Sequence, residues 1–317
     1  MSLADVGRAV DVLRGGGLVA FPTETVYGLG ADASSAAAVR RLFAVKRRPA
    51  EHPVIVHLGD PALLSEWAAE VPDAAAVLAR ACWPGPLTVV VRRAARVPDA
   101  VTGGRDTVGL RVPDQPLALE LLRAFGGGVA APSANRFGRV SPTTAADVRA
   151  DLGGDVDLVL DGGPCRVGIE STIVDCTGPG PAILREGGVP RRRVEALLGT
   201  TVPLRTSGEV AAPGTLASHY APRARVELTD RAEIDQRATA ALARGERVGV
   251  IGVPPADARV VGLGEPADGE RYAHDLYAML RAADACELDL VLAIVPTGSG
   301  LAAAVADRLR RAAGGAA

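Results

Sequence analysis

Lys46 is the only lysine in this chain of 317 residues, although lysine and arginine together number 35. Where arginine has replaced lysine this thoroughly, the remaining lysine is a candidate for a site that the planar guanidinium group of arginine does not fit. A compact ammonium group can lie between phosphate oxygens as a point charge. Because Lys46 also opens the cationic cluster 46–48, we expect a polyanion to bind at this point of the chain.

Asn135 is likewise the only asparagine, and it follows a short apolar strand predicted at 129–131. Lys46 lies shortly before another apolar run, residues 53–58, which is typical of a buried strand. Both rare residues therefore border predicted strands. Ligands of open α/β sheets bind beyond strand ends, so this placement favours a ligand site over an ordinary surface with polar side chains.

Three further features have the residue types of a binding site. Arg111 interrupts the apolar strand 109–113, where its guanidinium must pair with a substrate carboxylate or phosphate, or with an internal Asp or Glu. His57 at a strand end is explained equally well as a core histidine or as a ligand contact. Residues 22–32, which follow a strand predicted at 18–21, are rich in hydroxyls and glycine. They are predicted to form a loop that approaches a small polar ligand.

Standard catalytic and nucleotide-binding motifs are absent from the sequence. There is no Walker A spacing and no G-x-G-x-x-G after a predicted strand, so any ATP must bind in another mode. No Ser-His-Asp arrangement, H-E-x-x-H motif or catalytic cysteine signature is present. The chemistry is therefore expected to rely on binding and charge rather than on a covalent nucleophile.

Composition limits the classes of protein that fit. A net charge of −2 argues against an overall nucleic-acid footprint, although the clusters 46–48 and 191–193 remain local candidates for RNA contact. The four cysteines form no C-x-x-C pair and the start resembles no signal peptide, so we expect a cytoplasmic protein. No apolar run is long enough to span a membrane.

The elements that must position these residues fall into two domains. Helical and strand patterns alternate through residues 1–200, which predicts an α/β domain with a mixed sheet. Its helix at 142–151 is expected to take Ser141 as N-cap. Residues 201–223 lack a period and are predicted to be a linker. Residues 224–317 predict a smaller Rossmann-like domain with a parallel sheet. The linker tyrosine, Tyr220, either anchors the linker or belongs to a strap that covers a ligand.

Six motifs occur in an order that resembles the YrdC-like family, and the linker and tail resemble its two-domain form, the threonylcarbamoyl-AMP synthases. The resemblance covers essentially the whole chain. The motifs are Phe21 to Asp32, Lys46 to Pro49, Trp83 to Thr88, Gly109 to Pro113, Pro132 to Asn135 with Gly138 and Ser141, and Glu170 to Asp175.

This resemblance implies a YrdC-like twisted mixed sheet with helices and a nucleotidyltransferase that makes threonylcarbamoyl-AMP and pyrophosphate from L-threonine, bicarbonate and ATP. The product would serve a downstream tRNA threonylcarbamoyl transferase that modifies the adenosine beside the anticodon. The family implies Mg²⁺ with the ATP and a linker strap, residues 201–223, over the active site. A weak local tRNA contact and the absence of a membrane partner complete the expected partners.

The resemblance also implies the site residues. Threonine is expected at Thr25, His57, Arg111, the backbone of Ala131, and Ser171. ATP is expected at Lys46, Arg48, His52, Thr107, Ser133, Asn135, Ser141, Arg185 and Tyr220. Lys46 and Arg48 are expected to stabilise charge in catalysis, and no protein ligand to a metal is assignable. One residue departs from the family pattern, since His52 stands where many relatives have asparagine.

Two other functions are compatible with the same cleft. An RNA-binding module would use the 46–48 cluster to hold phosphates, and its affinity would fall steeply with salt. A carbamoyl transferase would instead use carbamoyl phosphate, as larger enzymes with a YrdC-like domain do. The chain is too short for the acylphosphatase and zinc-finger modules of those enzymes.

Overall fold

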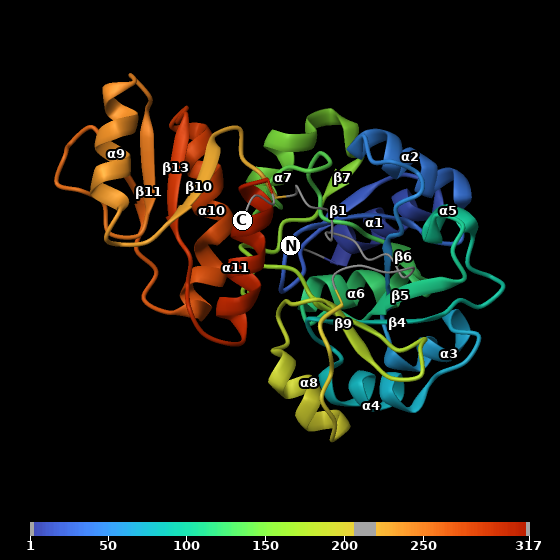
Figure 1. Cartoon of the computed structure of the whole chain (residues 1–317). Coiled ribbons are helices and arrows are strands. Elements are labelled where there is room, and N and C mark those ends of the chain that lie inside the picture. Colours follow the sequence, from blue (N-terminus) through green and yellow to red (C-terminus); the bar gives the residue numbers. More distant parts are fainter. Residues whose placement is uncertain (1–2, 206–219, 315–317) are drawn as a thin grey trace. The chain divides into compact units, whose positions relative to one another are not determined.

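The computed structural model describes residues 3–205 and 220–314 of the chain, which form two compact units. Within the described residues, the first unit contains residues 3–137 and 141–205. The second contains residues 138–140 and 220–314, so a three-residue segment of the amino-terminal half groups with the carboxyl-terminal unit. Figure 1 shows the first unit from blue to yellow and most of the second in orange and red. Most of the predicted linker strap, residues 206–219, lies outside the described residues.

The first unit is built on a nine-stranded sheet with the order β7-β1-β2-β6-β3-β5-β4-β8-β9. Its strands are β1 (Val19–Phe21), β2 (Gly28–Asp32), β3 (Ile55–His57), β4 (Leu87–Arg92), β5 (Thr107–Arg111), β6 (Val129–Ala130), β7 (Leu158–Val159), β8 (Thr172–Asp175) and β9 (Ala182–Arg185). β3 pairs parallel with β5 and β4 pairs parallel with β8, whereas β4–β5 and β8–β9 are antiparallel. The predicted mixed sheet is confirmed.

Helices connect these strands. They are α1 (Leu3–Arg14), α2 (Ala36–Lys46), α3 (Leu64–Trp67), α4 (Asp73–Cys82), α5 (Asp99–Thr102), α6 (Pro116–Phe125), α7 (Ala145–Leu152) and α8 (Arg191–Leu198), with 3-10 turns at Pro61–Leu63 and Gly153–Asp155. Caps set several boundaries: Ser35 accepts from the Ala38 backbone at the start of α2, and Gly126 ends α6 in the left-handed conformation.

The prediction of a loop across residues 22–32 is wrong for its second half, which is strand β2. β2 pairs antiparallel with β1, so only residues 22–27 connect the two strands. Gly30 explains why the sequence looks like a loop. A Cβ at Gly30 would lie 2.9 Å from both Phe21 Cε1 and Val129 Cγ1. Glycine is needed here for close packing within the sheet and not for a turn.

The helix predicted at 142–151 begins later than expected, at Ala145, and the expected cap at Ser141 is wrong. Thr144 is the N-cap, and it forms a capping box in which its hydroxyl accepts from Asp147 N and the Asp147 carboxylate accepts from Thr144 N. Ser141 instead donates its hydroxyl to Glu170 Oε1 at 2.7 Å. The Ser141 side chain is therefore directed to a buried carboxylate and not to a helix end.

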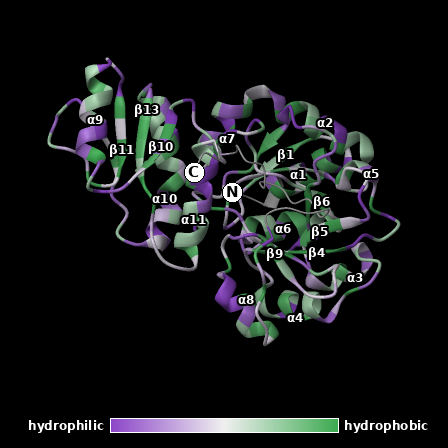
Figure 2. Cartoon of the chain, in the orientation of Figure 1, coloured by the Kyte–Doolittle hydropathy of each residue, from purple (hydrophilic) through white to green (hydrophobic). Residues whose placement is uncertain are grey.

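The second unit has a four-stranded sheet with the order β10-β13-β11-β12, and every pair is parallel. Its elements are β10 (Arg225–Thr229), α9 (Ile234–Ala243), β11 (Val248–Ile251), β12 (Val261–Gly264), α10 (Gly269–Ala285), β13 (Leu290–Ile294) and α11 (Leu301–Ala312). Figure 2 shows β11 and β13 as mostly hydrophobic, as expected for strands that helices cover. The predicted α/β fold of this domain, with a parallel sheet, is confirmed.

Each unit has its own hydrophobic core. In the first, buried side chains of α2, α4 and the central strands pack together, and a second cluster joins α1 with α6. In the second unit, α9 packs on β11 and β13 through residues such as Ile234, Val250 and Leu292. Among the described helices, none combines the length and apolarity needed to cross a bilayer.

Candidate active site

The loop 22–27 between β1 and β2 is held by a local hydrogen-bond network. Thr23 donates its hydroxyl to the Val26 carbonyl at 2.6 Å and lies 2.8 Å from the Thr25 hydroxyl. Other loops fix the backbone, because Tyr27 N donates to Pro142 O at 2.9 Å and Val167 N donates to Glu24 O at 2.7 Å. The loop is therefore a rigid platform whose hydroxyls and carboxylate are fixed in direction.

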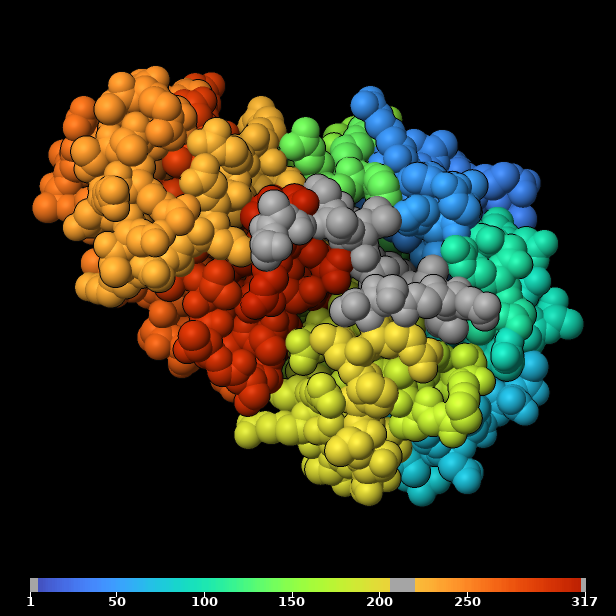
Figure 3. All heavy atoms as spheres, in the orientation of Figure 1, coloured from blue at the N-terminus to red at the C-terminus, as the bar shows by residue number. Residues whose placement is uncertain are grey.

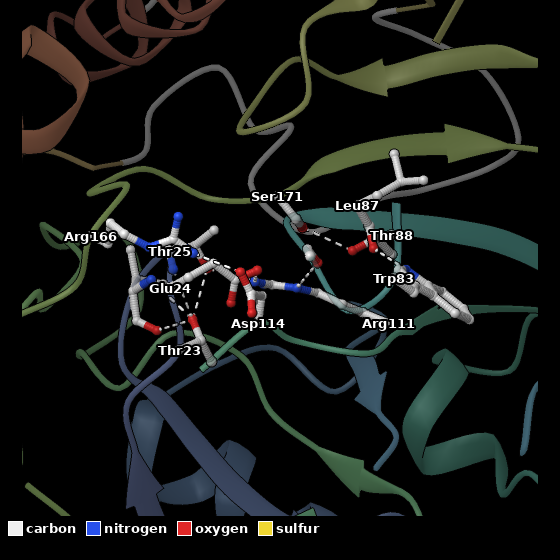
Figure 4. Close-up of polar contacts among 12 residues, drawn as sticks. Thr23, Glu24, Thr25, Trp83, Leu87, Thr88, Arg111, Asp114, Arg166 and Ser171 are labelled. Atoms are coloured by element: carbon white, nitrogen blue, oxygen red, sulfur yellow. Dashed lines mark hydrogen bonds and ion pairs between the residues drawn. The ribbon is translucent and has the colours of Figure 1, made fainter. Parts of the chain in front are cut away.

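Arg111, the last residue of β5, projects its guanidinium onto this platform (Figure 4). Its Nη1 donates to the Thr25 hydroxyl at 3.0 Å and its Nε donates to the Gly85 carbonyl at 3.3 Å. Its Nη2 lies 2.8 Å from Glu24 Oε1, and both side chains are at least 95% buried. The buried guanidinium thus has an internal carboxylate partner, which was one of the two alternatives expected from the sequence.

His57 lies beside this pair, because it ends β3 and is in register with Arg111 on the neighbouring parallel strand. It is 3% exposed, and its ring meets the Phe21 ring edge-on with centroids 6.1 Å apart. Burial lowers the pKa of His57 well below its ordinary value, and the Arg111 cation lowers it further. At neutral pH the imidazole is therefore uncharged and can serve a ligand as a donor or an acceptor.

Ala131 and Ser171 complete the expected threonine set. Ala131 follows β6 and donates its backbone N–H to Ile55 O at 3.0 Å, so this amide is already used by the sheet. The Ser171 hydroxyl lies 2.8 Å from the Thr88 hydroxyl and accepts from Arg185 Nη2 at 3.1 Å. Arg185 also donates from Nε to the Ser171 carbonyl at 3.0 Å, which fixes the start of β8. Figure 4 shows Ser171 and Thr88 facing each other near Arg111.

Lys46 joins two of the residues expected at ATP. It is 1% exposed, and its ammonium group donates to the carbonyl oxygens of Ser133 and Asn135, each at 2.5 Å. Asn135 is also buried and donates its amide to Arg136 O at 2.8 Å. Burial lowers the pKa of Lys46 well below its ordinary value, and nearby cations, above all Arg48, contribute. The structure brings the lone lysine and the lone asparagine into one cluster.

Arg48 reaches the site because helix α2 ends sharply. Arg47 adopts the left-handed conformation with φ 55°, and Arg48 N donates to Phe43 O at 2.9 Å. The Arg48 guanidinium donates to Pro53 O at 2.8 Å and lies 5.6 Å from the centre of the Phe137 ring. His52 meets the same ring edge-on at 5.4 Å, and burial and Arg48 lower its pKa.

The other two residues expected at ATP are Thr107 and Tyr220. Thr107 begins β5, four residues before Arg111, where it lines a small cavity together with Thr88 and Pro53. Tyr220 belongs to the second unit, in which it is 1% exposed and stacks on Tyr277 with ring centroids 5.8 Å apart.

Sequence reasoning missed two buried carboxylates. Glu24 pairs with Arg111, and Glu170 accepts from Ser141. Both stand inside motifs that were singled out, but only the hydroxyls and the cations were considered there. Both are distinguished by burial in the folded structure, where a carboxylate requires a partner, and the sequence gives no sign of that burial.

The described residues contain no group of three or more His, Cys, Asp or Glu side chains that could hold a metal ion. The structure also separates the two basic clusters: Lys46 and Arg48 are buried, whereas Arg192 and Arg193 on α8 are exposed. Figure 3 shows the yellow region that contains α8 at the surface of the first unit. Arg47 is also exposed, so this one residue of the cluster 46–48 and the arginines of α8 are available to a surface partner.

Comparisons with known proteins agree with this architecture. Residues 11–187 match the Sua5/YciO/YrdC family, described as "Telomere recombination", and residues 189–314 match the family described as "Threonylcarbamoyl-AMP synthase, C-terminal domain". The threonylcarbamoyl-AMP synthase of Pyrococcus abyssi is 41% identical over 318 residues, covering 96% of this chain and 93% of the relative. That of Bacillus subtilis is 38% identical over 329 residues, covering 98% of this chain and 93% of the relative.

A solved structure extends the likeness to three dimensions. The crystal structure of P. abyssi Sua5 complexed with L-threonine matches with a TM-score of 0.92 and 41% identity, covering 98% of this chain and 94% of that chain. With both family models matched in order along one chain, this protein belongs to the Sua5/YciO/YrdC family, in its two-domain threonylcarbamoyl-AMP synthase form.

Proposed function

We propose that this protein converts L-threonine, bicarbonate and ATP into threonylcarbamoyl-AMP and pyrophosphate. The observation that carries the proposal is the convergence of Thr25, His57 and Arg111 at the ends of β3, β5 and the loop 22–27. They offer a hydroxyl, a neutral imidazole and a guanidinium in one buried place. This combination suits a small amino acid with a carboxylate, and the relative of known structure binds L-threonine.

ATP is proposed to bind where Lys46, Arg48, Ser133 and Asn135 meet. The phosphates would replace carbonyl oxygens as partners of the Lys46 ammonium, and Arg48 would add a second cation. Ser141 and Arg185 are proposed to contact the nucleotide from the neighbouring loops, together with His52, Thr107 and Tyr220. Support for this set comes from the family resemblance and from the buried position of both cations.

Mg²⁺ is proposed to enter with ATP and to be held mainly by its phosphates, because the described residues contain no cluster of carboxylates and imidazoles around an open position. When bound, the ion would offset negative charge on the triphosphate. Glu170 is a buried carboxylate in hydrogen-bond contact with one of the proposed nucleotide residues, Ser141.

The reaction requires no covalent intermediate with the protein. Once threonine carries a carbamate, a carbamate oxygen attacks the α-phosphorus of ATP and pyrophosphate leaves. Arg111 and Thr25 would hold the amino acid, while Lys46 and Arg48 would stabilise the charge that moves toward the pyrophosphate oxygens. A buried site also keeps water away from the labile carbamate.

The adenylate is proposed to pass to a downstream tRNA threonylcarbamoyl transferase in the cytoplasm. A direct contact with tRNA would be weak and would use the arginines 191–193, of which Arg192 and Arg193 are exposed. Because Lys46 and Arg48 are buried, they cannot hold RNA phosphates at the surface, and only Arg47 of the cluster 46–48 remains for the RNA-binding alternative.

A single incubation tests the proposal. Purified protein with ATP, bicarbonate and labelled threonine should form a labelled adenylate and an equal amount of pyrophosphate. Leaving out threonine or bicarbonate should abolish both products. Product formation that depends on carbamoyl phosphate, or ATP turnover without threonine, would contradict the proposed reaction.

A further inference from the structure

Three buried side chains at the ends of β3, β5 and the loop 22–27 have polar atoms without a hydrogen-bond partner among the described residues. The atoms are both carboxylate oxygens of Glu24, Nδ1 of His57 and Nη2 of Arg111. A buried group left unsatisfied costs about 1–3 kcal/mol, and native structures contain few of them. Their gathering in one place indicates a ligand that supplies both donors and acceptors.

The charges define that ligand. Glu24 Oε1 and Arg111 Nη2 lie only 2.8 Å apart, yet neither makes a hydrogen bond within the described residues, so their attraction is purely that of an ion pair. The two side chains neutralise each other as an ion pair, and each still has hydrogen-bonding capacity for a ligand: Glu24 can accept from further donors and Arg111 Nη2 can donate to a further acceptor. The ammonium and carboxylate of an α-amino acid, separated by a single carbon, have the complementary arrangement.

The position of Glu24 is fixed by its own backbone. Val167 N donates to Glu24 O at 2.7 Å, and the flanking hydroxyls of Thr23 and Thr25 are tied together at 2.8 Å. The carboxylate is 99% buried, so it cannot swing out to solvent. Figure 4 shows it facing the Arg111 guanidinium from the loop side.

We propose that Glu24 binds the ammonium group of the amino acid and takes up the proton that this group loses when the carbamate forms. The inference rests on the proposed function and adds a specificity-determining and catalytic residue to it. Arg111 recognises the carboxylate, and Glu24 distinguishes an amino acid from an acid without an amine.

The proton transfer balances as follows. The ammonium gives one proton to the Glu24 carboxylate, and the freed amine nitrogen forms a bond to the carbon of bicarbonate. The bond from this carbon to the bicarbonate hydroxyl breaks, and the hydroxyl leaves as water with a second proton from the nitrogen. The products are the carbamate, one water and a neutral Glu24, with no change of oxidation state.

The first test compares two ligands by calorimetry without ATP: L-threonine and 2,3-dihydroxybutanoate of the same configuration, which has a hydroxyl in place of the ammonium. The native protein should prefer threonine. In Glu24→Gln this preference should fall by about tenfold or more, because a charge-assisted hydrogen bond is lost. If Glu24 only supports Arg111, both affinities will fall by the same factor and the inference is overturned.

Two further variants keep this test decisive. Glu24→Asp retains the negative charge and should retain the preference for threonine; its loss there would overturn recognition by charge. Asp114→Asn is the matched control, because this exposed carboxylate pairs with Arg166 at 2.7 Å and should not affect the preference. A thermal melt of each variant shows whether it is folded. If Glu24→Gln does not fold, Glu24→Asp still tests recognition by charge.

The second test concerns the proton. At saturating threonine, Glu24→Gln should lower kcat by about a hundredfold or more, because a positioned base is lost. An unchanged kcat would overturn proton uptake by Glu24. Failure of the native protein to make the adenylate would instead contradict the proposed function, so the two failures are distinguishable.

Discussion

At the scale of single residues, the ammonium group of Lys46 is held in an unusual environment. It is buried with carbonyl oxygens as partners, and its pKa lies well below the ordinary value because burial and the Arg48 cation disfavour the charged form. Phosphate groups would reverse this, since an anion favours the charged form. The pKa of Lys46 should therefore rise when ATP binds, and the protein should take up a proton.

This proton uptake can be measured. We expect ATP binding to absorb up to one proton per site at a pH between the pKa of Lys46 in the free protein and its pKa in the complex, seen by calorimetry across a pH series in buffers of different ionisation enthalpy. Lys46→Met should abolish the uptake even where ATP still binds. Binding heats that are the same in every buffer would show that Lys46 is already charged in the free protein.

The identity of the cation at position 46 leads to a separate prediction. Lys46→Arg keeps the charge but introduces a wider planar group where two carbonyl oxygens already lie within 2.5 Å of the ammonium. We expect this variant to lose most of its adenylate synthesis because the phosphates are displaced. The rate of pyrophosphate release measures the effect, and turnover at the native rate would refute the point-charge argument.

For Arg111 we expect a loss that affects one substrate more than the other. Arg111→Met removes the guanidinium that contacts Thr25 and Glu24 and should weaken threonine binding by about 2–5 kcal/mol, with a much smaller effect on ATP. Calorimetry with each ligand measures both effects. Arg166→Met, which alters an exposed arginine, is the control. Equal losses for the two ligands would indicate a structural arginine.

The sequence pointed to the cations of the site but not to its acids. Lys46 was conspicuous because lysine is otherwise absent, and Arg111 because it interrupts an apolar strand. Glu24 is neither a rare residue type nor an interruption of an apolar strand, since acidic residues are common along the chain and Glu24 lies between two threonines. Its importance comes from burial and from the unsatisfied oxygens, and both depend on tertiary contacts that no local pattern encodes.

At the scale of elements, the start of β8 is held by a close backbone contact. A Cβ at Gly187 would overlap the Glu170 carbonyl and lie 2.6 Å from Thr172 N, so only glycine fits. Gly187→Ala should displace Ser171 and destabilise the protein by about 1–3 kcal/mol. Threonine affinity and a thermal melt test this, and Gly180→Ala, with no atom near its Cβ, is the matched control. Equal behaviour of the two variants would contradict the role of this contact.

Element types were predictable where periodicity was strong, and boundaries were not. The pattern predicted a buried strand within residues 53–58, and β3 (Ile55–His57) is present there. It failed at β2, because the glycines of this strand are dictated by packing against Phe21 and Val129. It also misplaced the cap of α7, since the competing partner of Ser141 is a distant glutamate.

At the scale of the whole molecule, the two units have separate cores and separate sheets. The sequence indicated this division through the irregular stretch after residue 200, because a linker lacks the periods of helices and strands. It could not indicate that Gly138–Val140 would group with the second unit. This grouping depends on contacts such as the 2.6 Å hydrogen bond from Arg281 Nη2 to Val140 O.

The last prediction follows from how the site residues are divided between the units. Thr25, His57, Arg111, Ala131 and Ser171 all belong to the first unit, and the matching family model spans residues 11–187. A fragment of residues 1–205 should therefore melt cooperatively and bind threonine within about threefold of the full chain, because the first unit has its own core.

ATP should behave differently with this fragment. The segment Gly138–Val140 lies between Asn135 and Ser141 and groups with the second unit, so the fragment removes its contacts there, such as the hydrogen bond from Arg281, together with Tyr220. The loop from Asn135 to Ser141 then loses the contacts that hold its middle. We therefore expect ATP affinity to fall by more than tenfold, that is by over about 1.4 kcal/mol. Calorimetry with both ligands decides the matter. A fragment that binds ATP as tightly as the full chain would show that the second unit plays no part in holding the nucleotide, and one that fails to bind threonine would show that the first unit is not an independent domain.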